Sequence, residues 1–250
     1  MGEEAFSFPG AGGVELRGVL HLPAGRAASA VLLCHGMLSS KDGTKQVALA
    51  RALCEQGQAA LRFDFQGRGE SGGDLLGLSL TRELLDARAA LAELRRRAGA
   101  GRVGVVGSSL GGAVGLLLAA EQPVHALVTW AGVGRADLLA ERVVGREALA
   151  RWARDGVLVL EGAPVGYGLV EDGRRVDLPA AAARVRCPWL ILHGEADPVV
   201  PLADARLLHQ ASGGRAELEV LPGGDHQLVA PAHLARVLAR TAAFLRDALG

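Results

Sequence analysis

The chain has 250 residues, half of them hydrophobic, and its 27 basic and 27 acidic side chains cancel to a formal net charge of zero. This length and hydrophobic content exclude a disordered protein and suit one α/β domain over residues 1–250 with a full core. The balanced charge gives no electrostatic reason to expect nucleic acid or an anionic membrane as a partner. The oligomeric state does not follow from the sequence.

Strand-like and helix-like segments alternate along most of the chain. Short apolar or β-branched runs predict strands over 5–9, 14–22, 30–34, 59–65, 102–106, 124–130, 189–193 and 216–221. Helical spacing of apolar residues predicts helices over 41–56, 78–98, 112–120, 202–211 and 229–249. Such alternation implies right-handed βαβ units and a mostly parallel central sheet flanked by helices.

Residues 134–186 interrupt this alternation and are interpreted as a cap insertion within the single domain. The pattern predicts a helix over 136–154 and extended runs over 157–161 and 167–176, with a hairpin turn at 171–173. The insertion follows a strand at the sheet edge where ligands bind in this architecture. Its Trp152 and Tyr167 are therefore candidate substrate-binding side chains. The alternative is that these aromatics only attach the cap to the core.

Residues 107–111 read G-S-S-L-G, a G-x-S-x-G motif. A β-branched run precedes the motif and an apolar helical segment follows it, as a strand–turn–helix nucleophile site requires. The two glycines leave room for a sharp turn. The helix that begins there directs backbone N–H groups and its positive dipole end at the site. Ser109 is therefore the candidate nucleophile.

A serine hydroxyl needs a base, and the base needs an acid that holds its tautomer. Asp197 and His226 each follow a predicted strand, and the order Ser109, Asp197, His226 is the Ser…Asp…His order of α/β hydrolases. His193, at a strand end, and His233, on a helix, are poorer candidates for the base.

Two other aspartates are weaker candidates for the acid. Asp137 is the second choice after Asp197, and Asp225 is interpreted as a turn residue.

The oxyanion hole completes the candidate site. A tetrahedral oxyanion needs two hydrogen-bond donors, for which the N–H groups of Leu110 and Met37 are the candidates. Met37 follows Gly36, which permits close approach, although residues 35–36 also fit an ordinary tight turn.

With these motifs, the chain resembles the α/β-hydrolase superfamily over nearly its whole length outside 134–186. Residues 35–36, 64–71 and 194–201 are similar to the family's habitual segments, and the whole looks closest to small esterases of the cinnamoyl (feruloyl) esterase and serine-aminopeptidase-like branch. The resemblance implies an α/β-hydrolase fold, a catalytic set of Ser109, Asp197 and His226, and an oxyanion hole at Met37 and Leu110. In that branch 64–71 is a structural turn.

The resulting hypothesis is a serine esterase that cleaves a small-molecule carboxylic ester through an acyl-enzyme. A peptidase, thioesterase or acyltransferase would use the same residues, and a non-catalytic binding protein of this fold is a further alternative. No metal or cofactor is expected, because the Cys and His residues lack ligand spacing. The chain lacks a signal-peptide pattern and any run of ~18 apolar residues, so a cytoplasmic protein is expected.

Overall fold

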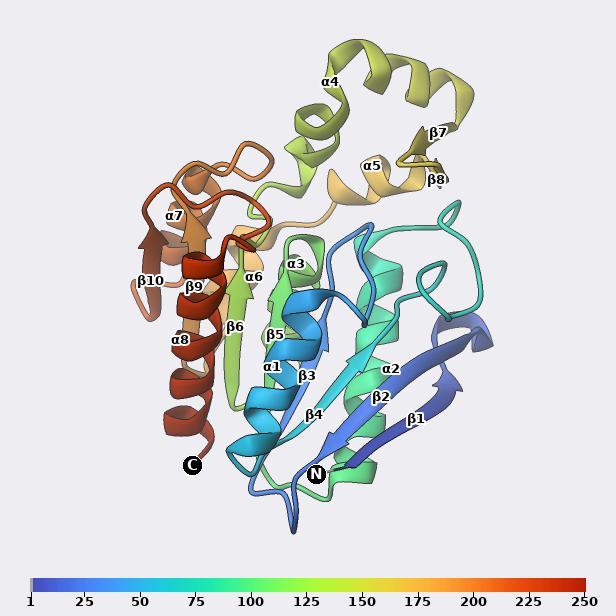
Figure 1. The fold of residues 1–250 in the computed structure, drawn as a ribbon. Helices are drawn as coiled ribbons and strands as arrows, with labels where there is room; N and C mark the ends of the chain where they lie inside the picture. The colour runs from blue at the N-terminus through green and yellow to red at the C-terminus, as the bar shows by residue number, and fades with distance from the viewer. Residues whose placement is uncertain (1) are drawn as a thin grey trace.

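The computed structural model describes residues 2–250, which contain an eight-stranded central sheet (Figure 1). The strands are β1 (Gly2–Pro9), β2 (Glu15–Leu22), β3 (Ala30–Cys34), β4 (Ala59–Phe63), β5 (Val103–Ser108), β6 (Ala126–Trp130), β9 (Trp189–Gly194) and β10 (Ala216–Leu221). Their order across the sheet is β1-β2-β4-β3-β5-β6-β9-β10. β1 and β2 form an antiparallel hairpin, β2 runs antiparallel to β4, and the remaining neighbours are parallel. The predicted mostly parallel sheet is confirmed.

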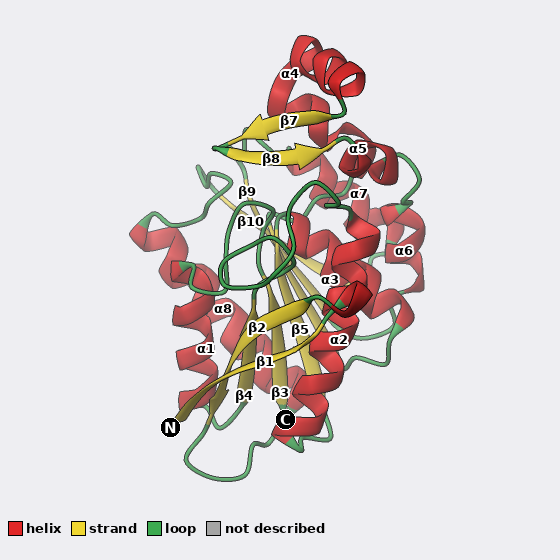
Figure 2. Ribbon diagram, turned by 90° about the vertical axis from the view of Figure 1, so that its right-hand side faces the viewer, coloured by secondary structure: helices red, strands yellow, loops and turns green. Residues whose placement is uncertain are grey.

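Helices cover both faces of this sheet (Figure 2). They are α1 (Thr44–Glu55) and α8 (Pro231–Leu249) on one face, and α2 (Leu80–Ala98), α3 (Leu110–Glu121), α6 (Leu178–Arg184) and α7 (Leu202–Ala211) on the other. Side chains of β3 alternate between the two cores, with Val31 and Leu33 in one and Leu32 in the other. Because both faces are covered, a central strand such as β3 is buried throughout and reads as a continuous apolar run.

The ends of α2 follow from its capping residues. The Ser79 hydroxyl accepts a hydrogen bond from the Arg82 backbone N–H at 3.0 Å, which satisfies one of the free donors of the first turn. Gly99 ends the helix in the left-handed conformation, with φ of 59°. This helix therefore begins two residues after the predicted start and ends where the sequence predicts.

The insertion lies beyond the carboxyl ends of the strands (Figure 1). It contains α4 (Ala136–Asp155), the hairpin of β7 (Val157–Leu160) and β8 (Ala163–Gly166), and α5 (Gly168–Gly173). α4 is broken at Gly145, whose φ of 77° and ψ of 164° belong to a region open essentially only to glycine. The final part of 134–186 is the unpredicted helix α6, which packs against α3 and α7 in the layer on the sheet.

The predicted extended run over 167–176, with a turn at 171–173, is wrong. The hairpin turn lies earlier, at Glu161 and Gly162, and the chain then enters α5. Asp172 accepts hydrogen bonds from the backbone N–H of Thr81 at 2.9 Å and from its hydroxyl at 2.8 Å. These bonds tie α5 to the first turn of α2, a tertiary contact that the local turn composition does not reveal.

A buried carboxylate fixes the start of the insertion to the rest of the molecule. Asp204 of α7 is 1% exposed, and one of its oxygens accepts from the N–H groups of Gly134 and Arg135 at 2.9 and 2.8 Å. The Arg142 guanidinium of α4 donates to the same oxygen at 2.9 Å. The insertion is therefore held by α7 at its first residues and by α2 near its end.

Candidate active site

Ser109 stands at the junction between β5 and α3 in a strained conformation. Its φ of 55° and ψ of −119° are unusual for a residue with a side chain and cost about 1–3 kcal/mol. The surrounding backbone holds it there, because its N–H donates to the Trp130 carbonyl at 2.9 Å and its own carbonyl accepts from Gly112 at 3.0 Å. This geometry lifts the hydroxyl out of the sheet toward the loops that follow the other strands.

The two glycines of the motif are required by close backbone approach. A Cβ at Gly107 would lie 2.1 Å from the Gly111 carbonyl oxygen, and a Cβ at Gly111 would lie 2.2 Å from the His35 carbonyl oxygen. Neither backbone atom is free to move away. The room that the sequence predicts for the turn is therefore present in the structure.

The structure brings Ser109 together with His226 and Asp197, although they are far apart in sequence. The His226 Nδ1 atom lies 2.8 Å from Asp197 Oδ2, and its Nε2 atom lies 3.0 Å from Ser109 Oγ. An ionised carboxylate only accepts hydrogen bonds, so Nδ1 carries the proton and Nε2 is left to accept from the serine hydroxyl. The tautomer is thereby the one in which His226 can remove the proton of Ser109.

Comparison with known proteins identifies the family of this chain. A family model described as serine aminopeptidase, S33, matches residues 25–155, more than half of the chain. The chain belongs to this family of α/β hydrolases. The esterase domain of a Rhodothermus marinus protein is 26% identical to the hydrolase, with a TM-score of 0.76 and full coverage of both chains, 100% each.

Two other relatives are similar over different extents. Est1E of Butyrivibrio proteoclasticus, solved with ferulic acid bound, has a TM-score of 0.83 over 98% of the hydrolase and 99% of its own chain, but at 21% identity it shows the fold alone. The mitochondrial palmitoyl-protein thioesterase ABHD10 of Rattus norvegicus is 28% identical over 181 residues, 68% of the hydrolase. The match spans 59% of that protein's length, which is less than two thirds.

The environment of Asp197 keeps its side chain ionised. Burial alone would raise the pKa of this carboxyl, but the hydrogen bond from His226 and those from the backbone N–H groups of Val200 and Val199 outweigh burial and lower it. The two backbone bonds, to Asp197 Oδ1, measure 2.8 and 2.9 Å. One oxygen therefore binds the loop after β9, and the other is free to orient His226.

A neutral buried histidine orients the first candidate oxyanion donor. Burial lowers the pKa of His35 to about 4, so its ring donates one hydrogen bond and accepts one. It accepts from the Phe65 N–H at 3.1 Å and its Nδ1 lies 2.8 Å from the Gly36 carbonyl oxygen. Because a trans peptide points its N–H opposite to its carbonyl, this bond directs the Met37 N–H away from His35.

The second candidate donor lies at the start of α3. Leu110 is the first residue of that helix, so its N–H belongs to the first turn, which lacks intrahelical acceptors. Gly36, which precedes Met37, lies directly against the nucleophile, because a Cβ there would lie 3.4 Å from Ser109 Cβ. Met37 and Leu110 both line the cavity that contains Ser109.

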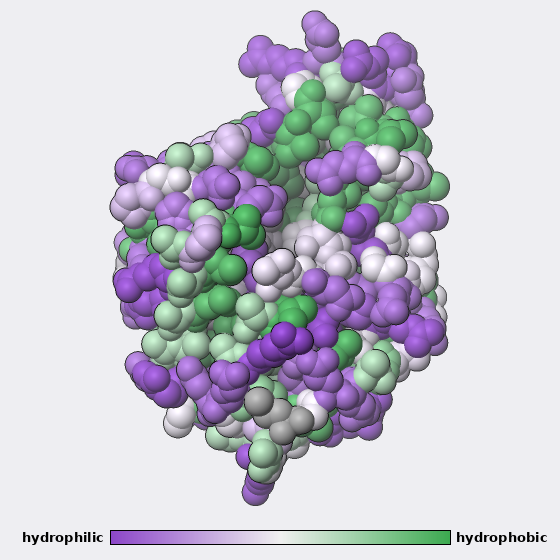
Figure 3. All heavy atoms as spheres, viewed as in Figure 1, coloured by the Kyte–Doolittle hydropathy of each residue, from purple (hydrophilic) through white to green (hydrophobic). Residues whose placement is uncertain are grey.

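That cavity has a volume of about 460 Å³ and lies under the insertion. Figure 3 shows apolar atoms gathered beneath the insertion, whose outer surface is polar. The apolar wall of the cavity is formed by Met37, Leu38, Leu139, Val143, Val199 and Val229. Leu139 and Val143 come from α4, where a spacing of four residues places them on one face. The spacing of Leu139 and Val143 could have identified them from the sequence. Nothing in the local sequence marks Glu161, which also lines the cavity.

Trp152 and Tyr167, which the sequence predicts at the substrate pocket, lie inside the insertion instead. Trp152 is 1% exposed and its indole N–H donates to the Val165 carbonyl at 3.0 Å. The two rings meet edge to face, with centroids 6.0 Å apart. Within residues 2–250, the side chains that line the cavity at Ser109 include neither of them. They pack α4 against the hairpin and α5, so their role is structural, but the contacts lie within the insertion rather than between the cap and the core as the alternative expected.

The weaker candidate residues have other partners. His193 is fully buried and its Nε2 donates to the Val200 carbonyl at 2.8 Å, and burial lowers its pKa. Asp137 pairs with Arg135 at 2.6 Å on the base of the insertion. Asp225 accepts from the Leu228 N–H at 2.8 Å, as a turn residue would. His193 Nε2 also lies 3.5 Å from Asp197 Oδ2, so His193 adjoins the acid, whereas the contacts of Asp137 and Asp225 stand apart from the chain of hydrogen bonds from Ser109.

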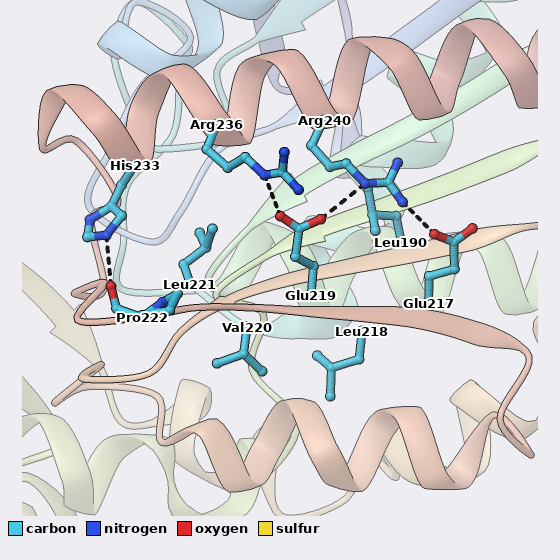
Figure 4. Close-up of a pocket in the computed structure, with 10 residues that line it drawn as sticks. All are labelled: Leu190, Glu217, Leu218, Glu219, Val220, Leu221, Pro222, His233, Arg236 and Arg240. Atoms are coloured by element: carbon cyan, nitrogen blue, oxygen red, sulfur yellow. Dashed lines mark hydrogen bonds and ion pairs between the residues drawn. The ribbon is translucent and has the colours of Figure 1, made fainter.

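His233 lies in a separate hollow of about 670 Å³ between β10 and α8 (Figure 4). Its Nε2 lies 3.1 Å from the Pro222 carbonyl oxygen, to which it donates. The charged groups there pair with one another, since Glu219 bonds to Arg236 at 2.7 Å and to Arg240 at 3.1 Å.

Throughout residues 2–250, groups of three or more His, Cys, Asp or Glu that could hold a metal ion are absent. Nor does any helix in that range have the length and apolar character to cross a bilayer.

Proposed function

We propose that this protein is a serine hydrolase that cleaves carboxylic esters through an acyl-enzyme on Ser109. The observation that carries the proposal is the continuous chain from Ser109 Oγ to His226 at 3.0 Å and from His226 to Asp197 at 2.8 Å. This chain opens onto a cavity that has an apolar wall, which suits an acyl or aryl group. The residues from 1 to 250 act as one domain, and the insertion acts as its cap.

In the proposed reaction, Ser109 Oγ attacks the acyl carbon as His226 Nε2 takes the hydroxyl proton. The N–H groups of Met37 and Leu110 stabilise the oxyanion of the tetrahedral intermediate. When the C–O bond breaks, His226 returns the proton to the departing alcohol and the acyl group stays on Ser109. Water then attacks this acyl-enzyme with His226 again as the base, which releases the acid and restores the serine hydroxyl. Asp197 stabilises the imidazolium in both halves.

A thioester is the second candidate substrate. The rat relative, 28% identical over 181 residues, is named as a palmitoyl-protein thioesterase. The same catalytic residues serve a thioester, since attack on the acyl carbon is unchanged and a thiol replaces the alcohol as leaving group. The apolar wall formed by Leu139, Val143 and their neighbours accepts an acyl chain in either case.

The test pairs substrates that differ only in the leaving atom. Oxygen esters and thioesters of the same acyl groups, from acetyl upward, are assayed together with aminoacyl anilides. We expect hydrolysis of the oxygen esters, stable labelling of Ser109 by a fluorophosphonate, and a loss of about 10⁶-fold in kcat for Ser109→Ala. Ser108→Ala is the matched control and keeps the fluorophosphonate site. A wild-type protein that neither hydrolyses any substrate nor takes the label would reject the proposal.

A further inference from the structure

Lys45 reaches into the candidate active site from the first turn of α1. Its Nζ donates to the Gln227 carbonyl at 2.6 Å and lies 3.4 Å from the Ser108 hydroxyl. The same ammonium lies 5.8 Å from the centre of the Trp130 ring. One side chain thus joins α1 to the residue before Ser109 and to the residue after His226.

This position is costly for a lysine. A cation in the first turn of a helix faces the positive end of the helix dipole. Lys45 is also half-buried in the cavity wall, where its ammonium loses part of its hydration. Neither cost is needed to form α1, because many uncharged residues suit the first turn of a helix. The contact with Gln227 is the feature that sets Lys45 apart from an ordinary surface lysine.

The turn that carries His226 is strained and is held from two sides. Leu228 has a φ of 53°, which is uncommon for a residue with a side chain. From within, Asp225 Oδ1 accepts from the Leu228 N–H at 2.8 Å. From outside, Lys45 binds the Gln227 carbonyl. Both clamps hold the same peptide, because the Gln227 carbonyl and the Leu228 N–H belong to one peptide unit. This unit lies one residue beyond His226, so it fixes the backbone that carries the imidazole.

We propose that Lys45 is a positioning residue, whose ammonium holds the Gln227 carbonyl and thereby keeps His226 Nε2 in line with Ser109 Oγ. The inference rests on the proposed serine-hydrolase function and adds a residue to its machinery. Lys45 touches neither the reacting atoms nor the proton in transfer. It acts on the rate through the geometry of the base, where a displacement of about 1 Å costs on the order of 10²-fold.

The protonation of Lys45 adds a measurable signature. Burial lowers the pKa of Lys45 to about 8, and the carboxylates of Asp225 and Asp197 oppose that effect without cancelling it. Ser108 and Trp130, the neighbours from β5 and β6, are uncharged, whereas His226 and Glu161 line the same cavity. Below pH 8 the ammonium makes a charge-assisted bond to Gln227, and above pH 8 the neutral amine makes a weaker one. The rate should therefore fall as the pH rises through 8.

The experiment compares Lys45→Met, Lys45→Arg and Arg51→Met with the wild type. Methionine keeps the length of the stem without a donor, arginine keeps a charge that does not titrate, and Arg51 is an exposed cation on the same helix. We expect Lys45→Met to lower kcat by about 10-fold to 10²-fold with KM within about twofold, and to remove the fall near pH 8. Lys45→Arg should restore much of kcat and also lack that fall, and Arg51→Met should behave as wild type.

The rate of fluorophosphonate labelling, measured over the same pH range, gives a second readout that needs no particular ester. The inference is overturned if Lys45→Met labels and turns over as fast as wild type, if Arg51→Met loses as much, or if the fall near pH 8 persists in Lys45→Met. Should Lys45→Met fail to fold, a fall near pH 8 that survives in Lys45→Arg rejects the inference. A wild type that is inert to both ester and label identifies instead a failure of the proposed function.

Discussion

Glu83 is a buried acid whose replacement should change how stability depends on pH. It lies on α2, is 2% exposed, and within residues 2–250 neither of its carboxylate oxygens has a hydrogen-bond partner. Burial raises the pKa of Glu83 to about 8 from an ordinary 4.5, and the nearby carboxylate of Asp86 adds to this effect. The folded protein therefore keeps a proton on Glu83 that the unfolded chain releases.

The magnitude follows from that difference in bound protons. Below pH 4.5 the carboxyl is protonated in both states and contributes nothing to the pH dependence. Between 4.5 and about 8 the unfolded chain binds fewer protons, so the free energy of unfolding falls by about 1.4 kcal/mol per pH unit. The total loss approaches about 5 kcal/mol above pH 8, and about 3 kcal/mol of it is present at pH 7.

Glu83→Gln removes this titration while keeping the shape of the side chain. Urea unfolding of both proteins at pH 5, 7 and 9 should give a difference in free energy of unfolding that grows in favour of the variant by several kcal/mol. The buried histidines titrate alike in both proteins and cancel in the difference. Glu55→Gln, at an exposed position on α1, is the matched control and should run parallel to wild type. Parallel curves for Glu83→Gln and wild type would refute the reasoning.

Three further predictions test the site and the contacts that support it. His226→Ala should lower ester turnover by about 10⁶-fold, whereas His233→Ala, outside the cavity, should leave it nearly unchanged, and the reverse outcome would exchange their roles. Asp204→Ala should lower the free energy of unfolding by about 3 kcal/mol, because it leaves two N–H groups and a guanidinium without their acceptor, and an unchanged urea midpoint would reject this clamp. Gly111→Ala should prevent folding, because its Cβ would lie 2.2 Å from the His35 carbonyl oxygen; a cooperative melt at the wild-type temperature would contradict the packing.

The parts of the site that sequence reasoning reached are those set by local pattern and topology. The motif at 107–111 specifies its own turn, and parallel strands bring the loops that carry Asp197 and His226 to the same edge of the sheet. Which insertion residues reach the cavity depends instead on tertiary packing. Trp152 has the size and polarity of a pocket residue, yet its indole N–H is bound within the insertion.

Lys45 was missed for a related reason. Its sequence neighbourhood is that of an ordinary solvated helix start, and only the fold places the Gln227 carbonyl 2.6 Å from its ammonium. The same holds for α5, where a local turn composition is overridden by hydrogen bonds between Asp172 and Thr81. Contacts between residues distant in sequence leave no periodicity for a single chain to display.

The break at Gly145 separates two halves of α4 that make different contacts. Leu139 and Val143 precede it and line the cavity at Ser109, whereas Trp152 follows it and packs against the hairpin. Because the backbone at Gly145 is not helical, the two halves of α4 do not form one rigid helix. A substitution that changes side-chain volume in one half therefore need not displace the other half. If the proposed function holds, substitutions in the first half of α4 should change which acyl groups fit the cavity, while the second half continues to pack against the hairpin.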